Sequence, residues 1–241
     1  MTLTILWLQL AGAAVVILVA SQFLARSADI ISFKTGLSRA FVGVLLLATA
    51  TSLPELGTGV ASVTLVGSPD LAAGDAFGSN LFNLLIIGIL DILWRDRPIL
   101  NSVAMRPVAV VGAAGIGMIS LAAIALVVQG STTAMSSWSV SPMSVLLIGA
   151  FLAVMYLTFR VEQTEESDPI AHDEAHPYSS ETLSRALSTY VLAAAVVVGS
   201  AIWLAQTGDR LADEMGWEAS YVGTQFLAFS TSLPELAVSV A

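Results

Sequence analysis

The chain has no cysteine and few charged residues. Of its 241 residues, 11% are Asp, Glu, Lys or Arg. The absence of cysteine excludes disulfide bonds and thiolate metal sites. The shortage of charge, together with 56% hydrophobic residues and a mean hydropathy of +0.84, excludes an ordinary soluble globular domain. We therefore predict an integral membrane protein.

The hydrophobic residues form runs that are long enough to cross a bilayer as helices. The first run has no Lys or Arg before Arg26 and is too long for the core of a signal peptide, so we expect a retained membrane helix. The predicted spans are Leu3–Leu24, Leu37–Val66, Leu71–Trp94, Val103–Gln129, Pro142–Phe159, Ala186–Gln206 and Ala219–Ala241. The expected fold class is an all-α membrane protein.

Basic residues are divided unequally between the two sides of the predicted membrane domain. If the seven spans alternate in direction, eight of the nine Lys and Arg residues fall on one side and Arg210 falls on the other. Short cytoplasmic loops carry the excess of Lys and Arg in membrane proteins. This bias predicts a multi-pass protein of the cell membrane, with the N-terminus outside and the hydrophilic stretch 160–185 in the cytoplasm.

The stretch 160–185 is rich in acidic residues and also contains His172 and His176. Its simplest interpretation is a solvated linker between two halves of the protein. Two histidines four residues apart, with carboxylates nearby, can also hold a metal ion, so a regulatory metal site is a second interpretation. No other feature of the sequence supports a metal site there.

The pentapeptide Thr-Ser-Leu-Pro-Glu occurs twice, at 51–55 and at 231–235. An offset of 180 residues aligns 41–61 with 221–241 and makes 12 of these 21 positions identical. Five spans separate equivalent positions, so the second copy is inverted, as in many secondary transporters. We predict a first half-domain at 1–159, with its complete repeat at about 37–94, then the linker at 160–185. The start of a second half-domain, truncated in this chain, is predicted at 186–241.

Each copy of the pentapeptide places a carboxylate inside a hydrophobic span. A charge at mid-membrane costs about 2.5–3.5 kcal/mol on insertion scales, so an intramembrane Glu is a candidate functional residue. Pro54 and Pro234 each remove a backbone hydrogen bond and are expected to break their helices. Thr51 and Glu55 share a helix face, with Ser52 beside them. Carboxylate, hydroxyl and carbonyl oxygens are the ligands that Na⁺ and Ca²⁺ prefer.

The third predicted span carries a second group of polar residues. Asp75, Ser79 and Asn83 follow one another at steps of four and therefore form one polar stripe along a helix. Gly74 and Gly78 form a small-residue pair that allows another helix backbone to approach closely. Close packing explains the glycines but does not explain an acid and two further polar groups on one stripe.

With these motifs the chain resembles the cation/calcium exchanger superfamily, in particular the prokaryotic sodium/calcium exchangers. Their signature reads Gly-Thr-Ser-Leu-Pro-Glu, followed by Gly-Asn-x-x-Gly-Ser-Asn-x-Phe-Asn. The resemblance implies ten membrane helices in two inverted halves of five, of which about seven are present here. The ion ligands that it implies are Ala48, Thr51, Ser52, Glu55, Ser79, Asn83, Ala228, Thr231, Ser232 and Glu235. Two positions depart from the signature: Asp75 replaces the more usual Asn, and Ala50 replaces Gly.

The resemblance and the paired acids predict a secondary transporter that exchanges Na⁺ for Ca²⁺ by alternating access. These ions are the expected cargo, the lipid bilayer is the expected partner, and neither a cofactor nor nucleic acid is expected. A second hypothesis is Ca²⁺/H⁺ antiport through the same carboxylates, with Asp75 as an accessory residue or proton relay. A third follows from the incomplete second repeat, namely an inactive or partial exchanger, or one completed by the missing C-terminal helices or by another copy.

An intramembrane enzyme is a rival of a different class, because paired acids also serve as a protease dyad. Three features argue against it. A hydroxyl residue stands close to each Glu, no His or Cys occurs in any predicted span, and the repeat is inverted. We therefore expect a transporter and not an enzyme.

Overall fold

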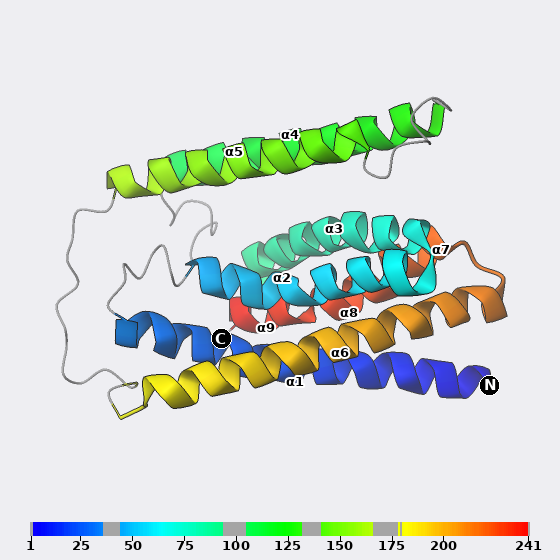
Figure 1. Cartoon of the computed structure of the whole chain (residues 1–241), viewed down its shortest axis with the longest axis horizontal. Coiled ribbons are helices and arrows are strands. Elements are labelled where there is room, and N and C mark those ends of the chain that lie inside the picture. Colours follow the sequence, from blue (N-terminus) through cyan, green and yellow to red (C-terminus); the bar gives the residue numbers. More distant parts are fainter. Residues whose placement is uncertain are drawn as a thin grey trace. The chain divides into compact units, whose positions relative to one another are not determined.

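The structure, a computed structural model, describes residues 2–35, 44–93, 105–131, 141–165, 178 and 180–240. Nearly every residue in these ranges is helical, and no strand occurs within them. The helices are α1 (Leu3–Thr35), α2 (Val44–Ala61), α3 (Pro69–Leu93), α4 (Met105–Ser131), α5 (Pro142–Glu165), α6 (Leu183–Met215), α7 (Ala219–Val222), α8 (Ala228–Thr231) and α9 (Leu233–Val240) (Figure 1). The all-α prediction is confirmed. His172, His176 and most of the predicted linker lie outside the described residues.

Three helices in the described part of the chain are long and apolar enough to cross a membrane, namely α1, α3 and α6. Shorter apolar segments, Gly112–Val128 and Pro142–Leu157, lie within α4 and α5. The region of the seventh predicted span is divided, because a π-helical turn at Gly223–Leu227 separates α7 from α8 and Ser232 separates α8 from α9. A second π-helical turn, Ser62–Val66, follows α2.

Two helices are longer than the spans predicted for them. The first predicted span ends at Leu24, but α1 continues to Thr35, because its last third is buried at Ala28, Ile30 and Ile31. The sixth predicted span ends at Gln206, but α6 continues to Met215. Gly216 ends α6 in the left-handed conformation, with a φ of 65°, which glycine adopts without steric cost. Tertiary packing, and not hydrophobicity alone, sets these ends.

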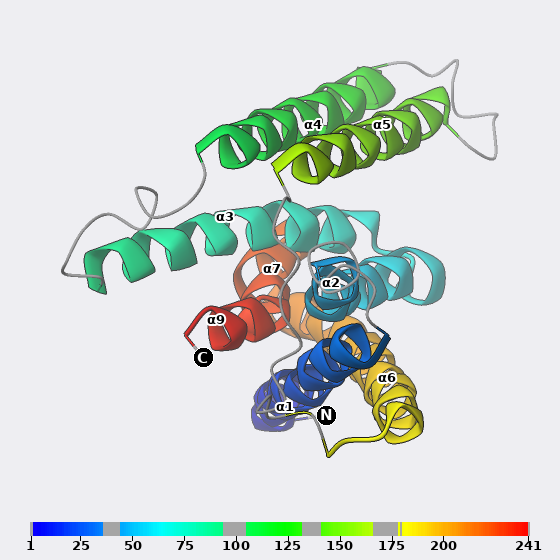
Figure 2. The same ribbon diagram turned by 90° about the vertical axis from the view of Figure 1, so that its left-hand side faces the viewer.

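The chain forms two compact units, and the larger one combines Met1–Ile92 with Asp173–Ala241. In this unit α1 and α6 pack side by side and run in opposite directions (Figures 1 and 2). The chain also runs in opposite directions in α2 and in α8–α9 (Figure 1). Each helix pair joins equivalent elements of the two repeats, which is the arrangement that an inverted repeat predicts. The smaller unit, Leu93–His172, contains α4 packed against α5.

The core of the larger unit is built from both ends of the sequence. Its largest buried cluster includes Leu6, Leu10 and Ile17 of α1, Leu71 of α3, Leu204 and Leu211 of α6, and Val222 and Leu227 near α7. Trp7 and Trp217 pack at its edge around Phe226, whose ring stacks on that of Trp217 with the centroids 5.8 Å apart. The first and second repeats therefore share one core, in which α2 contacts α8 and α1 contacts α8 and α9.

Candidate functional site

The two Thr-Ser-Leu-Pro-Glu segments meet inside the larger unit. Both carboxylate oxygens of Glu55 are buried, and no described residue forms a hydrogen bond with them. Oε2 of Glu235 is also buried and has no hydrogen-bond partner among the described residues. The carboxylate of Glu55 lies within electrostatic range of Glu235 and of Asp75. Buried acids without partners repel one another in a medium of low dielectric, so this arrangement favours the binding of cations or protons.

Hydroxyl groups from each repeat approach the carboxylate of the other. The Thr231 hydroxyl lies close to the Glu55 carboxylate without forming a hydrogen bond to it. The Thr51 hydroxyl, in turn, lies close to the Glu235 carboxylate. These are equivalent residues at the 180-residue offset, so the inverted repeat appears in the geometry of the side chains. Oxygen atoms of both repeats therefore line a common space.

Asp75 joins the two repeats through hydrogen bonds. Its side chain is 1% exposed. Its Oδ2 accepts a hydrogen bond from Thr58, and its Oδ1 accepts one of 3.3 Å from Thr231. The Ser79 hydroxyl, one turn further along α3, lies 3.4 Å from the Thr231 hydroxyl. The polar stripe predicted on α3 thus meets the second pentapeptide at Asp75 and Ser79.

Glycines allow the backbone of α3 to pack directly against the backbone of the second repeat. A Cβ atom at Gly74 would lie 2.3 Å from the carbonyl oxygen of Ser220. A Cβ atom at Gly78 would lie 2.6 Å from the Cβ atom of Ala228. A Cβ atom at Gly223 would lie 2.3 Å from the Leu71 carbonyl oxygen. Real Cβ atoms do not come this close. The packing role predicted for Gly74 and Gly78 is confirmed, and this packing brings Asp75 to Thr231.

A cavity of about 280 Å³ opens beside the second glutamate. It is lined by Leu47, Ala48, Thr51, Glu235, Val238 and Ser239, which come from α2 and α9. Thr51 donates a hydrogen bond of 3.3 Å to the Ala48 carbonyl, so hydroxyl and carbonyl oxygens occur together on its wall. The cavity gives one path by which a small ion could reach the carboxylate of Glu235.

The two copies place their predicted ligands in different surroundings. Ser232 and Ala228 are buried, at 2% and 0% exposure, whereas their counterparts Ser52 and Ala48 are exposed. The Asn83 side chain is half-buried, and its Oδ1 is buried with no partner among the described residues. The second copy therefore turns more of its predicted ligands toward the interior.

The prolines also act differently in the two copies. The helix break predicted at Pro54 is wrong, because α2 runs through Pro54 without interruption. The helix loses only the hydrogen bond that Pro54 cannot donate. In the second copy the helix stops at Thr231 and resumes at Leu233, with Ser232 between them at φ −87° and ψ 0°. Pro234 is the second residue of α9. Backbone N–H groups in the first turn of a helix have no partner within that helix, so the proline removes no helical hydrogen bond there.

Thr58 and Thr224 also contribute to the site, although neither was predicted from the sequence. Thr58 is completely buried, and its hydroxyl lies 3.0 Å from the carbonyl oxygens of both Pro54 and Glu55 besides donating to Asp75. Thr224 donates a hydrogen bond of 3.2 Å to the Gly74 carbonyl across the repeat boundary. A signal for Thr58 was present, because a hydroxyl residue four positions after Pro54 lies on the helix face of that proline.

The donor set is suited to a hard cation. Among the described residues, no three His, Cys, Asp or Glu side chains converge as a metal-binding cluster. A cation here would need hydroxyl and carbonyl oxygens in addition to the carboxylates of Glu55 and Glu235. Such all-oxygen ligand sets suit Na⁺ and Ca²⁺, whereas zinc and copper prefer imidazole or thiolate.

Comparison with known proteins gives a family match over most of the chain. The profile of the family described as sodium/calcium exchanger protein matches residues 5–167 and 185–241. The inner membrane protein YrbG of Escherichia coli (strain K12) is 29% identical over 228 residues, which are 89% of this chain and 63% of that protein. No solved structure matches the chain significantly.

Two further relatives match over shorter stretches. The putative antiporter CaxA of Alkalimonas amylolytica is 39% identical over 88 residues, 36% of this chain and 27% of that protein. The sodium/calcium exchanger MaX1 of Methanosarcina acetivorans is 34% identical over 74 residues, 30% of this chain and 21% of that protein. The chain thus spans at most 63% of the length of these relatives.

Proposed function

This chain belongs to the sodium/calcium exchanger protein family, and from that premise we propose that it exchanges Na⁺ for Ca²⁺ across a membrane. The names of two relatives, an antiporter and a sodium/calcium exchanger, support cation antiport. Its apolar helices α1, α3 and α6 support location in a membrane.

One observation carries the proposal. Glu55 and Glu235, from two inverted copies of one motif, bring buried and unsatisfied carboxylate oxygens within electrostatic range of each other. A membrane protein keeps such expensive groups where they bind ions or protons. One Ca²⁺ or two Na⁺ would neutralise the two glutamates equally well, so the two ions compete for one set of oxygens.

The proposed ligands combine both repeats. They are Ala48, Thr51, Ser52, Glu55, Ser79 and Asn83 from the first, and Ala228, Thr231, Ser232 and Glu235 from the second. The contacts of Thr231 with Ser79 and Asp75 support the inclusion of α3. The exposure of Ser52 and Ala48 means that these two would have to join the site when an ion binds. Rocking of the inverted repeats about the site would expose it to each side in turn and produce antiport without a covalent step.

The test is Na⁺-driven Ca²⁺ uptake into vesicles that contain the complete protein. Glu55→Gln keeps the size of the side chain but removes the charge, so we expect uptake to be abolished. Glu214→Gln makes the same change at an exposed position near the end of α6 and should leave uptake unaltered. Near-normal uptake by the Glu55 variant would overturn the site assignment.

Ca²⁺/H⁺ antiport is a second candidate, because one observation favours it. Asp75 adds a third, buried carboxylate to the site at a position where the family signature more usually has Asn. A proton could move between Asp75 and the glutamates during the cycle. Uptake driven by a Na⁺ gradient at equal pH, and then by a pH gradient without Na⁺, separates the two candidates. Uptake in the second experiment alone would establish proton coupling.

The proposed orientation has the N-terminus outside and the stretch 160–185 in the cytoplasm. The chain has no cysteine, so single introduced cysteines can be labelled without background. Asp70→Cys, at an exposed position in the first turn of α3, should react with a membrane-impermeant maleimide added to intact cells. Thr182→Cys, before α6, should react only after the membrane is opened. The reverse pattern would contradict the orientation.

A further inference from the structure

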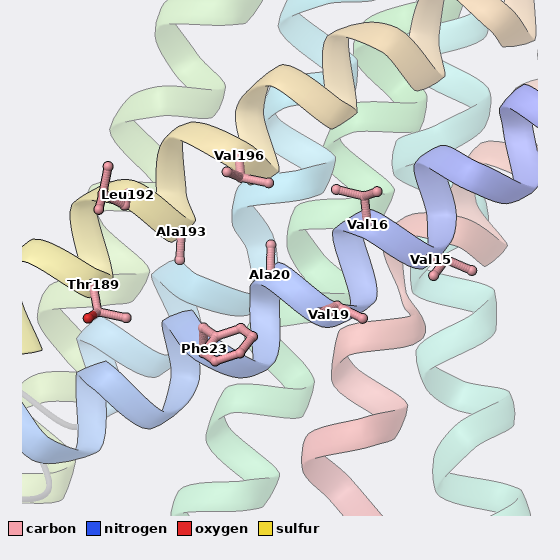
Figure 3. A pocket seen from close by; sticks show the side chains of 9 residues that line it. All are labelled: Val15, Val16, Val19, Ala20, Phe23, Thr189, Leu192, Ala193 and Val196. Carbon is pink, nitrogen blue, oxygen red and sulfur yellow. The ribbon is translucent and has the colours of Figure 1, made fainter.

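A groove runs along the α1–α6 pair and is lined by residues of these two helices, so neither glutamate contributes to it. Its volume is about 470 Å³. Ala20 and Ala193 form its floor, and their small side chains leave the space open (Figure 3). The walls are branched apolar side chains that remain exposed, including Val15, Leu192 and Val196, which are 57%, 68% and 47% exposed. Apart from Thr189 at one end, the lining is apolar.

The dimensions of the groove fit a lipid acyl chain. On α1 it extends from Val15 to Phe23, which is about 12 Å at a helical rise of about 1.5 Å per residue. One leaflet of a bilayer contributes about 15 Å of hydrocarbon, half of the usual core thickness. Both walls belong to helices that are long and apolar enough to cross a membrane, so the groove faces lipid unless protein covers it.

Two arginines lie beyond the end of the groove that Phe23 and Thr189 mark in Figure 3. Arg26 follows Phe23 by three positions and Arg185 precedes Thr189 by four, so each continues the face of its helix that lines the groove. Both arginines are exposed. In the proposed orientation this end lies on the cytoplasmic side, where basic pockets between membrane helices bind the headgroups of phospholipids.

Acidic residues near this end do not neutralise the arginines completely. A carboxylate oxygen of Glu181 lies 3.7 Å from the Arg26 guanidinium, and the Arg26 side chain is still 65% exposed. Asp29 is exposed one turn further along α1. A guanidinium group has five N–H donors, so one ion pair leaves donors for a phosphate. Arg185 adds a second cationic group at the same end of the groove.

We propose that this groove binds one glycerophospholipid of the surrounding bilayer. An acyl chain lies between the walls of α1 and α6, and the headgroup phosphate contacts Arg26 and Arg185. The site is independent of the cation site and of the proposed exchange activity. Its occupant would fasten the two antiparallel helices together at their cytoplasmic ends.

The first test blocks the groove. Native mass spectrometry of the detergent-purified full chain, titrated with dioleoylphosphatidylethanolamine, should show one tightly bound lipid. Val196→Trp fills the groove and should weaken binding by at least about tenfold, since it removes most of the contact with the acyl chain. Val191→Trp makes the same change at a 64% exposed position of α6 outside the groove and serves as the matched control. Val15→Trp blocks the groove from α1 if the Val196 variant fails to fold.

The second test addresses the headgroup. The double variant Arg26→Gln/Arg185→Gln should weaken binding by about tenfold or more, because charge-assisted hydrogen bonds are lost. Arg210→Gln, at the other end of α6, should have no effect. Dioleoylglycerol, which has the same acyl chains without phosphate, should bind more weakly than the phospholipid, and inorganic phosphate alone should not compete.

Three results would overturn the proposal. The Val196 and Val191 variants could bind lipid equally well, or dioleoylglycerol could bind as tightly as the phospholipid. The wild-type chain could instead form a dimer that Val196→Trp dissociates, in which case a second copy occupies the groove.

Discussion

The two copies of Thr-Ser-Leu-Pro-Glu have the same five residues but different structures. In the first copy these residues continue a helix, α2, that passes through Pro54. In the second copy the chain leaves the helix at Ser232 and starts a new one at Leu233. The π-helical turns differ as well, because one follows the first copy and the other precedes the second.

The pentapeptide alone therefore does not decide where the helix breaks. The second copy is pressed against α3, where Gly78 lies against Ala228 and Asp75 binds Thr231. A π-helical turn, Gly223–Leu227, directly precedes α8, which ends at Thr231. The first copy has no such turn before it in the described part of α2. Packing against a neighbour therefore sets the backbone of a segment whose own sequence permits either form.

The largest expected effect tests whether the copies are equivalent in function. Glu235→Gln should reduce Ca²⁺ uptake by at least about a hundredfold, as we expect for Glu55→Gln, because removing one buried charge leaves the other carboxylate unable to hold the ion alone. Ca²⁺ flux into vesicles of the complete protein measures both. A variant that keeps substantial flux would show that only one copy holds the ion.

The next prediction breaks the packing that distinguishes the second copy. Gly74→Ala would place a Cβ atom 2.3 Å from the Ser220 carbonyl oxygen, so α3 must move away from the second repeat. We expect a loss of about 3 kcal/mol in the free energy of unfolding. Denaturation in detergent measures it. Gly88→Ala, in the same helix, has no atom within 4 Å of the new Cβ and should stabilise the helix by about 0.5–1 kcal/mol.

A smaller effect is expected from making the first copy more like the second. Val238 occupies the position equivalent to Thr58, so Thr58→Val removes a difference between the repeats. The change deprives the buried Asp75 of a hydrogen-bond donor and should cost about 2 kcal/mol of unfolding free energy. Thr64→Val is the control, because the exposed Thr64 hydroxyl donates to the Val60 carbonyl of its own helical turn. Equal stability of the two variants would show that Asp75 does not depend on Thr58.

The smallest effect comes from the prolines. Pro54→Ala restores a hydrogen bond inside α2 but loses the packing of a buried ring, so we expect a net gain of about 1 kcal/mol. The Pro234 ring is buried too, but Pro234 lies in the first turn of α9, so Pro234→Ala restores no hydrogen bond and should cost about 1 kcal/mol of unfolding free energy. Thermal unfolding in detergent compares them. A gain in stability for the Pro234 variant equal to that of the Pro54 variant would contradict the different roles assigned to the two prolines.

The general fold could be predicted from the sequence. Long apolar runs and scarce charges led to the prediction of an all-α membrane protein. The two pentapeptides, the glycine pair and the polar stripe of the third span led to the family that the comparisons confirm. The packing of Gly74 and Gly78 was predictable because small residues four apart form a flat helix face. The ligand roles of the ten residues named above stay predictions.

Other features could not be read from the sequence, for physical reasons. Hydropathy ended the first span at Leu24, but burial against neighbouring helices extends α1 to Thr35. The hydrogen bond between Asp75 and Thr231 joins residues 156 positions apart, and no local pattern encodes such a contact. The exposure of Ser52 and the burial of Ser232 differ although their flanking residues are the same. These features depend on tertiary contacts.

The separation of Asp75 from Thr231 also has a consequence for synthesis. Ribosomes add about 5–20 residues per second, so Thr231 is made roughly eight to thirty seconds after Asp75. During that interval α3 holds an acid whose partner in the second repeat does not yet exist. Thr58, made 17 residues earlier, can already donate its hydrogen bond. In the nascent chain, the Thr58 hydroxyl can therefore satisfy the Asp75 carboxylate before the second repeat has been made.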